Sequence, residues 1–190
     1  MGRQLHSATL GILGYGQIGE YLARLGVAFG MKVLVYDPFK AVRETDVAQA
    51  DFGAVLSQSD FLVCLVVANE QTENLMNAAA FAQMKRTAFF LNLSRGNLVN
   101  EKALEAALND EQIAGAAMDV GRAADQKPSL FLARRPDVIA TPHTAGLTPE
   151  AAEHQAFDTV KQAAELVAGR MPPGAANPDA ATRLARLRKS

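Results

Sequence analysis

The chain has 190 residues, of which 49% are hydrophobic and 21% are charged, a composition typical of a folded globular protein and unlike that of a disordered chain. Its 19 basic and 20 acidic residues leave a net charge of −1, so no global field attracts nucleic acid or an anionic membrane. The one cysteine, Cys64, excludes an internal disulfide and a cysteine-rich metal site, and we expect no bound metal. With no apolar run long enough to cross a membrane, the sequence predicts a cytoplasmic protein with neither nucleic-acid nor membrane partners.

Short apolar runs bounded by turn residues recur along the chain and predict strands. Their hydrophobicity is nearly continuous rather than alternating, which is typical of parallel strands covered by helices on both faces. Helical stretches lie between the runs, so the sequence predicts an α/β fold with a doubly wound parallel sheet. The expected strands lie at residues 9–13, 32–36, 61–67, 87–93, 113–118 and 138–140.

Three helices have clear beginnings or ends in the sequence. The first covers residues 17–29, and Gly30 supplies a left-handed stop after it. The second begins at Asn100, and the third begins at Thr148, where Pro149 takes the first helical position. The apolar stripes are Ile18, Tyr21, Leu22, Leu25 and Phe29 in the first helix, and Ala103, Leu104, Ala107 and Leu108 in the second.

A glycine motif follows the first expected strand and opens the first helix: residues 14–19 read Gly-Tyr-Gly-Gln-Ile-Gly. In a dinucleotide-binding loop, Gly14 permits the tight turn and Gly16 lets the backbone approach a pyrophosphate. Asp37 ends the second strand, where its carboxylate can bind both ribose hydroxyls and repel a 2′-phosphate. The sequence therefore predicts NAD rather than NADP, although Lys40 and Arg43 nearby leave NADP open. A methyltransferase that binds S-adenosylmethionine can begin with the same pattern, and only the downstream residues separate the two classes.

Three further motifs stand where later strands end. Residues 92–96 read Asn-Leu-Ser-Arg-Gly, residues 116–120 read Ala-Ala-Met-Asp-Val, and residues 141–143 read Thr-Pro-His. Ligands of open α/β sheets bind at these strand ends. Together with the glycine loop, the motifs resemble the D-isomer-specific 2-hydroxyacid dehydrogenase family, in particular its Rossmann-type NAD-binding domain. The resemblance covers about residues 5–168 of this chain. A methyltransferase would leave Arg95 and His143 without a role.

The resemblance implies a reaction and a set of site residues. It implies interconversion of a small 2-hydroxy acid and a 2-oxo acid by hydride transfer with NAD. Arg95 would hold the substrate carboxylate, and His143 would take and return the hydroxyl proton. The alternative interpretation is a stand-alone NAD-binding module or fragment without catalysis. The implied cofactor-binding residues are Gly14, Gly16, Gln17 and Ile18 at the pyrophosphate, Asp37 at the ribose, Val66, Leu93 and Ser94 along the dinucleotide, and Asp119 at the nicotinamide.

The sequence departs from the family pattern at the carboxylate that orients the histidine. Ala124 stands where the family has a glutamate. Asp125 is one residue later and one methylene shorter, so it could contact His143 only if the loop takes another route. Whether it does so is left open by the sequence. Without such a carboxylate, proton transfer by the histidine would be slower.

The resemblance also predicts the organisation of the chain. Residues 1–146 would form the dinucleotide-binding domain, residues 147–170 a helix that rejoins the substrate domain, and residues 171–190 a flexible tail with a solvated basic end. Family members carry a further segment before the glycine loop, which forms most of the substrate domain. Without that segment the last helix would expose apolar side chains, so we expect a homodimer or association through this helix.

Overall fold

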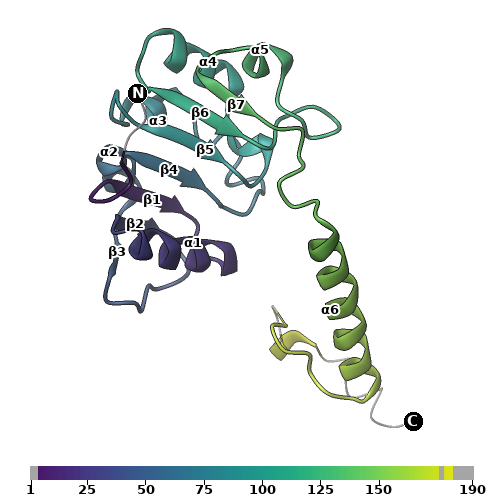
Figure 1. Cartoon of the computed structure of the whole chain (residues 1–190). Helices are drawn as coiled ribbons and strands as arrows, with labels where there is room; N and C mark the ends of the chain where they lie inside the picture. Colours follow the sequence, from purple (N-terminus) through teal and green to yellow (C-terminus); the bar gives the residue numbers. More distant parts are fainter. Residues whose placement is uncertain (1–3, 176–177, 182–190) are drawn as a thin grey trace. The chain divides into compact units, whose positions relative to one another are not determined.

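The computed structural model describes residues 4–175 and 178–181 and divides the chain into two units, Met1–Thr144 and Ala145–Ser190. The first unit contains one seven-stranded sheet, in which every strand is parallel to its neighbours (Figure 1). Its strand order is β3-β2-β1-β4-β5-β6-β7, with helices packed on both faces. The predicted doubly wound parallel sheet is thereby confirmed.

Most of the strands lie where the sequence predicts them, and some are shorter than expected. The run at 61–67 stops being a strand at Cys64, because its neighbour β1 ends at the paired residue Leu13. The edge strand β3 was missed, since it has three residues and only the first is buried. The strands are β1 (Thr9–Leu13), β2 (Lys32–Tyr36), β3 (Val47–Gln49), β4 (Phe61–Cys64), β5 (Phe89–Asn92), β6 (Gly115–Met118) and β7 (Val138–Ala140).

The first helix packs on the sheet mainly through small residues, and of the five residues of its predicted apolar stripe only Leu22 packs against the core. Its buried residues are Gly19, Ala23 and Gly26. A Cβ at Gly26 would lie 2.7 Å from a methyl carbon of Leu10, so the helix approaches the sheet too closely for larger side chains. The predicted stripe is corrected accordingly, because Ile18, Tyr21, Leu25 and Phe29 are exposed.

Side-chain caps begin most of the helices. Asn100 accepts a hydrogen bond from the N–H of Ala103, and Thr148 from that of Ala151, as their places in the sequence predict. Asp51 and Asn77 cap two short helices that the sequence reasoning missed. The helices of the first unit are α1 (Gln17–Ala28), α2 (Phe52–Gln58), α3 (Ala78–Ala82), α4 (Glu101–Asn109) and α5 (Leu130–Ala133), with a 3-10 turn, η1, at Gly96–Leu98.

Alternate residues of the central strands enter two hydrophobic clusters on opposite faces of the sheet. Leu10 and Ile12 of β1 belong to the cluster that includes Ala23 of α1, whereas Leu13 belongs to the cluster on the face covered by α2, α3, α4 and α5. The stripe predicted for the second helix is confirmed, since Leu104, Ala107 and Leu108 of α4 are buried. The sheet is thus covered on both faces, and its carboxyl-terminal edge is left to carry the loops.

The second unit consists of α6 (Pro149–Val167) and a 3-10 turn, η2 (Pro178–Ala180). None of the residues in α6 is buried. Among the described residues, every helix is too short or too polar to span a lipid bilayer. Residues 176–177 and 182–190 of the predicted tail lie outside the described part of the chain.

Candidate functional site: the carboxyl-terminal edge of the sheet

The site begins at β1, where the strand order changes direction. From β1 the chain proceeds to β2 and β3 on one side and to β4 on the other, and the loops that follow β1 and β4 diverge there. Gly14 turns the chain out of β1 with a φ of +95°. A Cβ at Gly14 would lie 2.8 Å from the carbonyl of Leu65, so two loop backbones touch and only glycine fits.

The glycine loop ends at Gly16, the residue before α1. No side chain caps this helix, and an added Cβ at Gly16 would meet no atom within 4 Å. The first-turn residues Gln17 and Ile18 therefore lie at an open helix N-terminus, which attracts an anion through its N–H groups and dipole. Gly19 lets the helix start close to the loop, because its Cβ would lie 2.3 Å from the Gly14 carbonyl oxygen. These features fit a pyrophosphate.

Asp37 follows β2 beside this loop. Its carboxylate accepts backbone N–H groups from Tyr15 at 2.7 Å, Phe39 at 2.8 Å and Lys40 at 2.9 Å. Burial by itself would raise the pKa of this carboxyl, but the three N–H donors and the Lys40 charge together hold the pKa below its ordinary value. The group is therefore a fixed anion, which suits ribose hydroxyls as donors.

A cavity of about 440 Å³ lies over these residues. This volume falls within the range of small-molecule sites, and the residues that line the cavity are mostly apolar at its surface. Its walls come from the loops after β1, β2 and β4, so it fits the adenosine half of a dinucleotide. The lining includes Gly14, Tyr15, Gly16, Tyr36, Asp37, Phe39, Lys40, Val66, Thr72 and Leu75.

Several of these lining residues were not identified from the sequence. Phe39 is 93% exposed, and Lys40 forms an ion pair with Glu20 while its ammonium lies 5.4 Å from the ring centroid of Tyr15. Only the proximity of Lys40 to Asp37 in the sequence indicated a role. The pairing with Glu20 matters, because it occupies the cation that could otherwise meet a 2′-phosphate.

The loops after β4 and β5 are joined by Ser94. Its hydroxyl donates to the carbonyl of Val66 at 2.7 Å, which places these two predicted cofactor residues next to each other. Asn92 accepts the N–H of Ser94 and donates to the carbonyl of Arg95, at 3.2 and 2.9 Å. Leu93 is 46% exposed between them. The loop that carries Arg95 is thus shaped by a buried amide.

Asp119 and His143 follow β6 and β7. Asp119 is 7% exposed and accepts the Thr141 hydroxyl at 2.5 Å and the Thr144 N–H at 2.9 Å. These donors flank His143, whose backbone has a φ of +57°, so one buried carboxylate holds the loop of the histidine from both sides. The structure brings Arg95, Asp119 and His143 to the same edge of three neighbouring strands.

Residues 1–145 match the family model of the D-isomer specific 2-hydroxyacid dehydrogenase NAD binding domain. The chain belongs to this family. It is 38% identical over 165 residues to a glycerate dehydrogenase of Methylorubrum extorquens, covering 86% of this chain and 51% of that protein. It is 36% identical over 172 residues to a D-3-phosphoglycerate dehydrogenase of Synechocystis sp., covering 89% of this chain and 31% of the other. The chain therefore spans a third to a half of the length of these curated relatives.

Solved dehydrogenase and reductase structures have the same fold, and some of them contain a nicotinamide cofactor. A D-lactate dehydrogenase of Lactobacillus jensenii with NAD+ superposes with a TM-score of 0.81 at 30% identity, over 91% of this chain and 56% of that one. An acyclic imino acid reductase in complex with NADPH and D-Arg superposes with a TM-score of 0.78 at 26% identity, over 90% and 54%. The predicted NAD-binding domain is thereby confirmed.

Asp125, the acid that the sequence offers as a partner for His143, is engaged by Lys127. Asp125 binds the Lys127 ammonium at 2.8 Å and the Lys127 N–H at 3.2 Å, and Lys127 holds the pKa of Asp125 below its ordinary value. The loop closes on itself, since the Gly121 N–H donates to the Gln126 carbonyl at 2.7 Å. No hydrogen bond or ion pair reaches the imidazole of His143 from the described residues. The loop after β6 therefore directs Asp125 to Lys127 and not to His143.

Proposed function

We propose that this chain is the cofactor-binding part of an enzyme that interconverts a small D-2-hydroxy acid and its 2-oxo acid by hydride transfer with NAD(H). The observation that carries the proposal is the order of groups along one sheet edge. The dinucleotide cavity lies over β1, β2 and β4, Arg95 follows β5, and His143 follows β7. Such an order would place the nicotinamide, a carboxylate-binding cation and a proton carrier next to one another.

When bound, NADH would supply the hydride for reduction and NAD+ would accept it in oxidation, and residues of this chain would bind the substrate and carry the proton. Arg95 binds the substrate carboxylate, because a guanidinium offers a planar pair of donors that matches a carboxylate. His143 accepts the hydroxyl proton during oxidation and returns it during reduction. Asp119 orients the nicotinamide amide and keeps the histidine loop in place through Thr141 and Thr144.

An assay of NADH oxidation with glyoxylate, pyruvate and hydroxypyruvate tests this proposal. Because the described residues form the cofactor-binding side of a substrate cleft, we expect negligible turnover from residues 1–190 alone and clear turnover after fusion to a relative's substrate domain. In the fusion, Arg95→Ala or His143→Ala should lower turnover about 10²- to 10⁴-fold without changing NAD affinity. Asp125→Asn is the matched control, and we expect no effect because Asp125 binds Lys127.

A second candidate function is binding of NAD without catalysis. It is favoured by the imidazole of His143, which no described carboxylate orients, while Asp125 is engaged elsewhere. If the fusion binds NAD and remains inert with every 2-oxo acid, this function replaces the dehydrogenase.

We also propose that the chain associates with itself, and that it works in the cytoplasm, where a lone cysteine stays reduced. Self-association is supported by the exposed apolar side chains Phe157, Val160 and Val167 of α6. A Phe157→Asp, Val160→Asp variant should therefore sediment as a smaller species than the wild-type chain. Unchanged sedimentation would remove α6 from the interface.

A further inference from the structure

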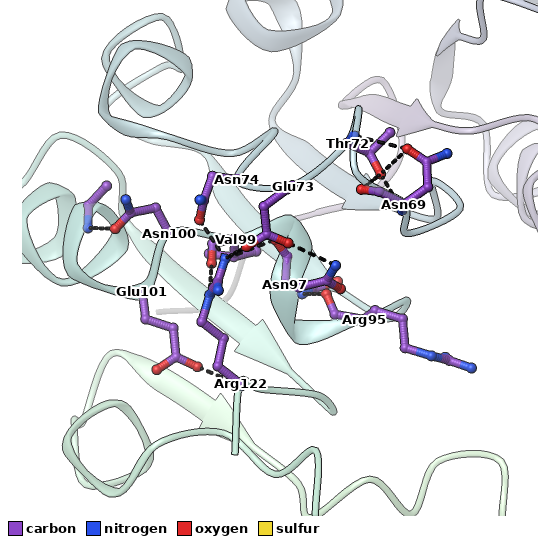
Figure 2. A network of polar contacts seen from close by, with 12 residues as sticks. Asn69, Thr72, Glu73, Asn74, Arg95, Asn97, Val99, Asn100, Glu101 and Arg122 are labelled. Atoms are coloured by element: carbon purple, nitrogen blue, oxygen red, sulfur yellow. Dashed lines mark hydrogen bonds and ion pairs between the residues drawn. The ribbon is translucent and has the colours of Figure 1, made fainter. Parts of the chain in front are cut away.

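Arg122 lies in the loop after β6 and donates hydrogen bonds to two other loops of the sheet edge (Figure 2). Its Nε donates to the Val99 carbonyl at 2.9 Å, and its Nη2 donates to the Asn97 carbonyl at 3.0 Å. The same Nη2 forms an ion pair with Glu73 at 2.7 Å and contacts the side-chain oxygen of Asn74. One guanidinium therefore joins the loops after β4, β5 and β6.

Two of its partners lie directly beyond Arg95. The turn η1 begins at the residue after Arg95, contains Asn97 and ends just before Val99. The Asn97 carbonyl also accepts the Asn74 N–H at 2.9 Å, and the Asn97 amide donates to Glu73 at 3.0 Å. The position of η1 therefore depends on the hydrogen bonds among Arg122, Glu73, Asn74 and Asn97.

Backbone contact brings the loop of Arg122 against the loop of Arg95. A Cβ at Gly96 would lie 2.0 Å from the carbonyl of Gly121, the residue before Arg122. A Cβ at Gly121 would lie 2.3 Å from the Lys127 carbonyl oxygen. Gly96 therefore allows the backbones of the two loops to touch, so displacement of one loop displaces the other, and Gly121 allows its own loop to close against Lys127.

The side chain of Arg95 makes few contacts of its own. Its side chain is exposed, its Nη1 donates to the Ser94 carbonyl at 2.8 Å, and it points away from the Arg122 cluster (Figure 2). A cavity of about 200 Å³ lies between the two arginines and is lined by both. A long, exposed side chain of this kind is aimed by its backbone, since few contacts restrict its rotamers.

We propose that Arg122 is a positioning residue, which holds the loop after β5 in the shape that directs Arg95 toward the substrate carboxylate. This inference rests on the proposed function, in which Arg95 binds that carboxylate. Arg122 does not compete for the acid, because its charge is paired with Glu73. The role requires a planar group with several donors, so lysine cannot reproduce it. The hydrogen bond from Arg122 lowers the pKa of Glu73, which keeps the partner ionised.

The first test measures loop opening in the full chain with NADH bound. Three backbone N–H groups join the loops after β4 and β5: Asn74 to Asn97, Met76 to Leu98 and Asn100 to Met76, at 2.9, 2.9 and 3.0 Å. In Arg122→Lys we expect their amide hydrogen exchange to accelerate about tenfold or more. Arg135→Lys is the matched control, because the Arg135 guanidinium makes three side-chain hydrogen bonds, against four for Arg122, but lies just before β7 at the other end of the strands.

The second test measures the affinity for oxamate, an unreactive 2-oxo acid analogue, by NMR titration of the NADH-bound chain. We expect Arg122→Lys to weaken oxamate binding about tenfold and to leave NADH affinity unchanged. In an Arg95→Ala background the same substitution should have no further effect, because Arg122 acts through Arg95. A merely structural role would lower oxamate binding equally in both backgrounds.

The outcomes separate this inference from the proposed function. Unchanged exchange in Arg122→Lys, or an equal loss of oxamate affinity with and without Arg95, overturns the positioning role. If neither the wild-type chain nor its fusion to a relative's substrate domain binds oxamate in the presence of NADH, the substrate role proposed for Arg95 fails. The exchange rates alone then decide whether Arg122 holds the loop.

Discussion

Asp37 meets three backbone N–H groups before any cofactor arrives, and this fixes a negative charge at the ribose end of the cavity. A 2′-phosphate there would meet a like charge, while Lys40 is occupied by Glu20. We therefore predict that NAD binds at least about tenfold more tightly than NADP, a difference of about 1.4 kcal/mol. Calorimetric titration with both cofactors measures it, with Lys40→Ala as a control that leaves the ratio unchanged. Equal affinities would show that a nearby cation neutralises Asp37.

The same carboxylate gives a pH dependence of stability. Its folded-state pKa is lowered, so it stabilises the fold above the unfolded-state pKa of about 3.9, and this contribution is lost as the pH falls through the folded-state value. We predict that Asp37→Asn is less stable than the wild type at pH 7 and that the difference shrinks below about pH 4. Urea unfolding at both pH values measures it. A variant as stable as the wild type at pH 7 would contradict the assignment.

Alanine substitutions at Gly16 and Gly96 distinguish an effect on cofactor binding from an effect on the packing of the loops. An added methyl at Gly16 meets nothing, whereas one at Gly96 meets the Gly121 carbonyl at 2.0 Å. We predict that Gly16→Ala keeps its unfolding free energy but binds NAD at least about tenfold more weakly, because the methyl occupies the approach of the pyrophosphate. Gly96→Ala should lose about 1–3 kcal/mol of stability. Thermal unfolding and calorimetry on both variants test the pair, and a reversed pattern would refute it.

At the scale of elements, α4 is anchored next to the site by its cap. The Asn100 side chain accepts the Ala103 N–H at 3.0 Å, and the same residue's N–H reaches Met76. We predict that Asn100→Ala lowers the unfolding free energy by about 1 kcal/mol, or the Tm by about 2–4 °C. Asn100→Asp keeps the acceptor and should remain near the wild type. Equal loss in both variants would mean that the cap contributes little.

For the whole molecule, the division into two units has a direct consequence. The sheet, its helices and every predicted site residue lie in Met1–Thr144. We predict that a chain of residues 1–146 folds and binds NAD with an affinity within about twofold of the full chain, because the second unit adds no group to the dinucleotide cavity. Circular dichroism and calorimetry measure it. Loss of folding would show that residues 147–190 complete the core.

Local signals were enough to determine much of this protein from its sequence. The caps at Asn100 and Thr148 act within three residues, and the glycine spacing and the place of Asp37 after β2 are read directly along the chain, so these patterns predict the loop and the helix starts. Continuous apolar runs likewise predicted a parallel sheet. The roles of Arg95 and His143 remain predictions that rest on family resemblance.

Long-range contacts decided the remainder. The α1 face that packs on the sheet was set by close approach to Leu10, and four of the five residues in its predicted apolar stripe are exposed. Arg122 has no signal in the sequence, because its partners lie 23 to 49 residues away and meet only when the loops of parallel strands gather at one edge. Such pairings depend on the tertiary arrangement of neighbouring strands, which no local pattern encodes.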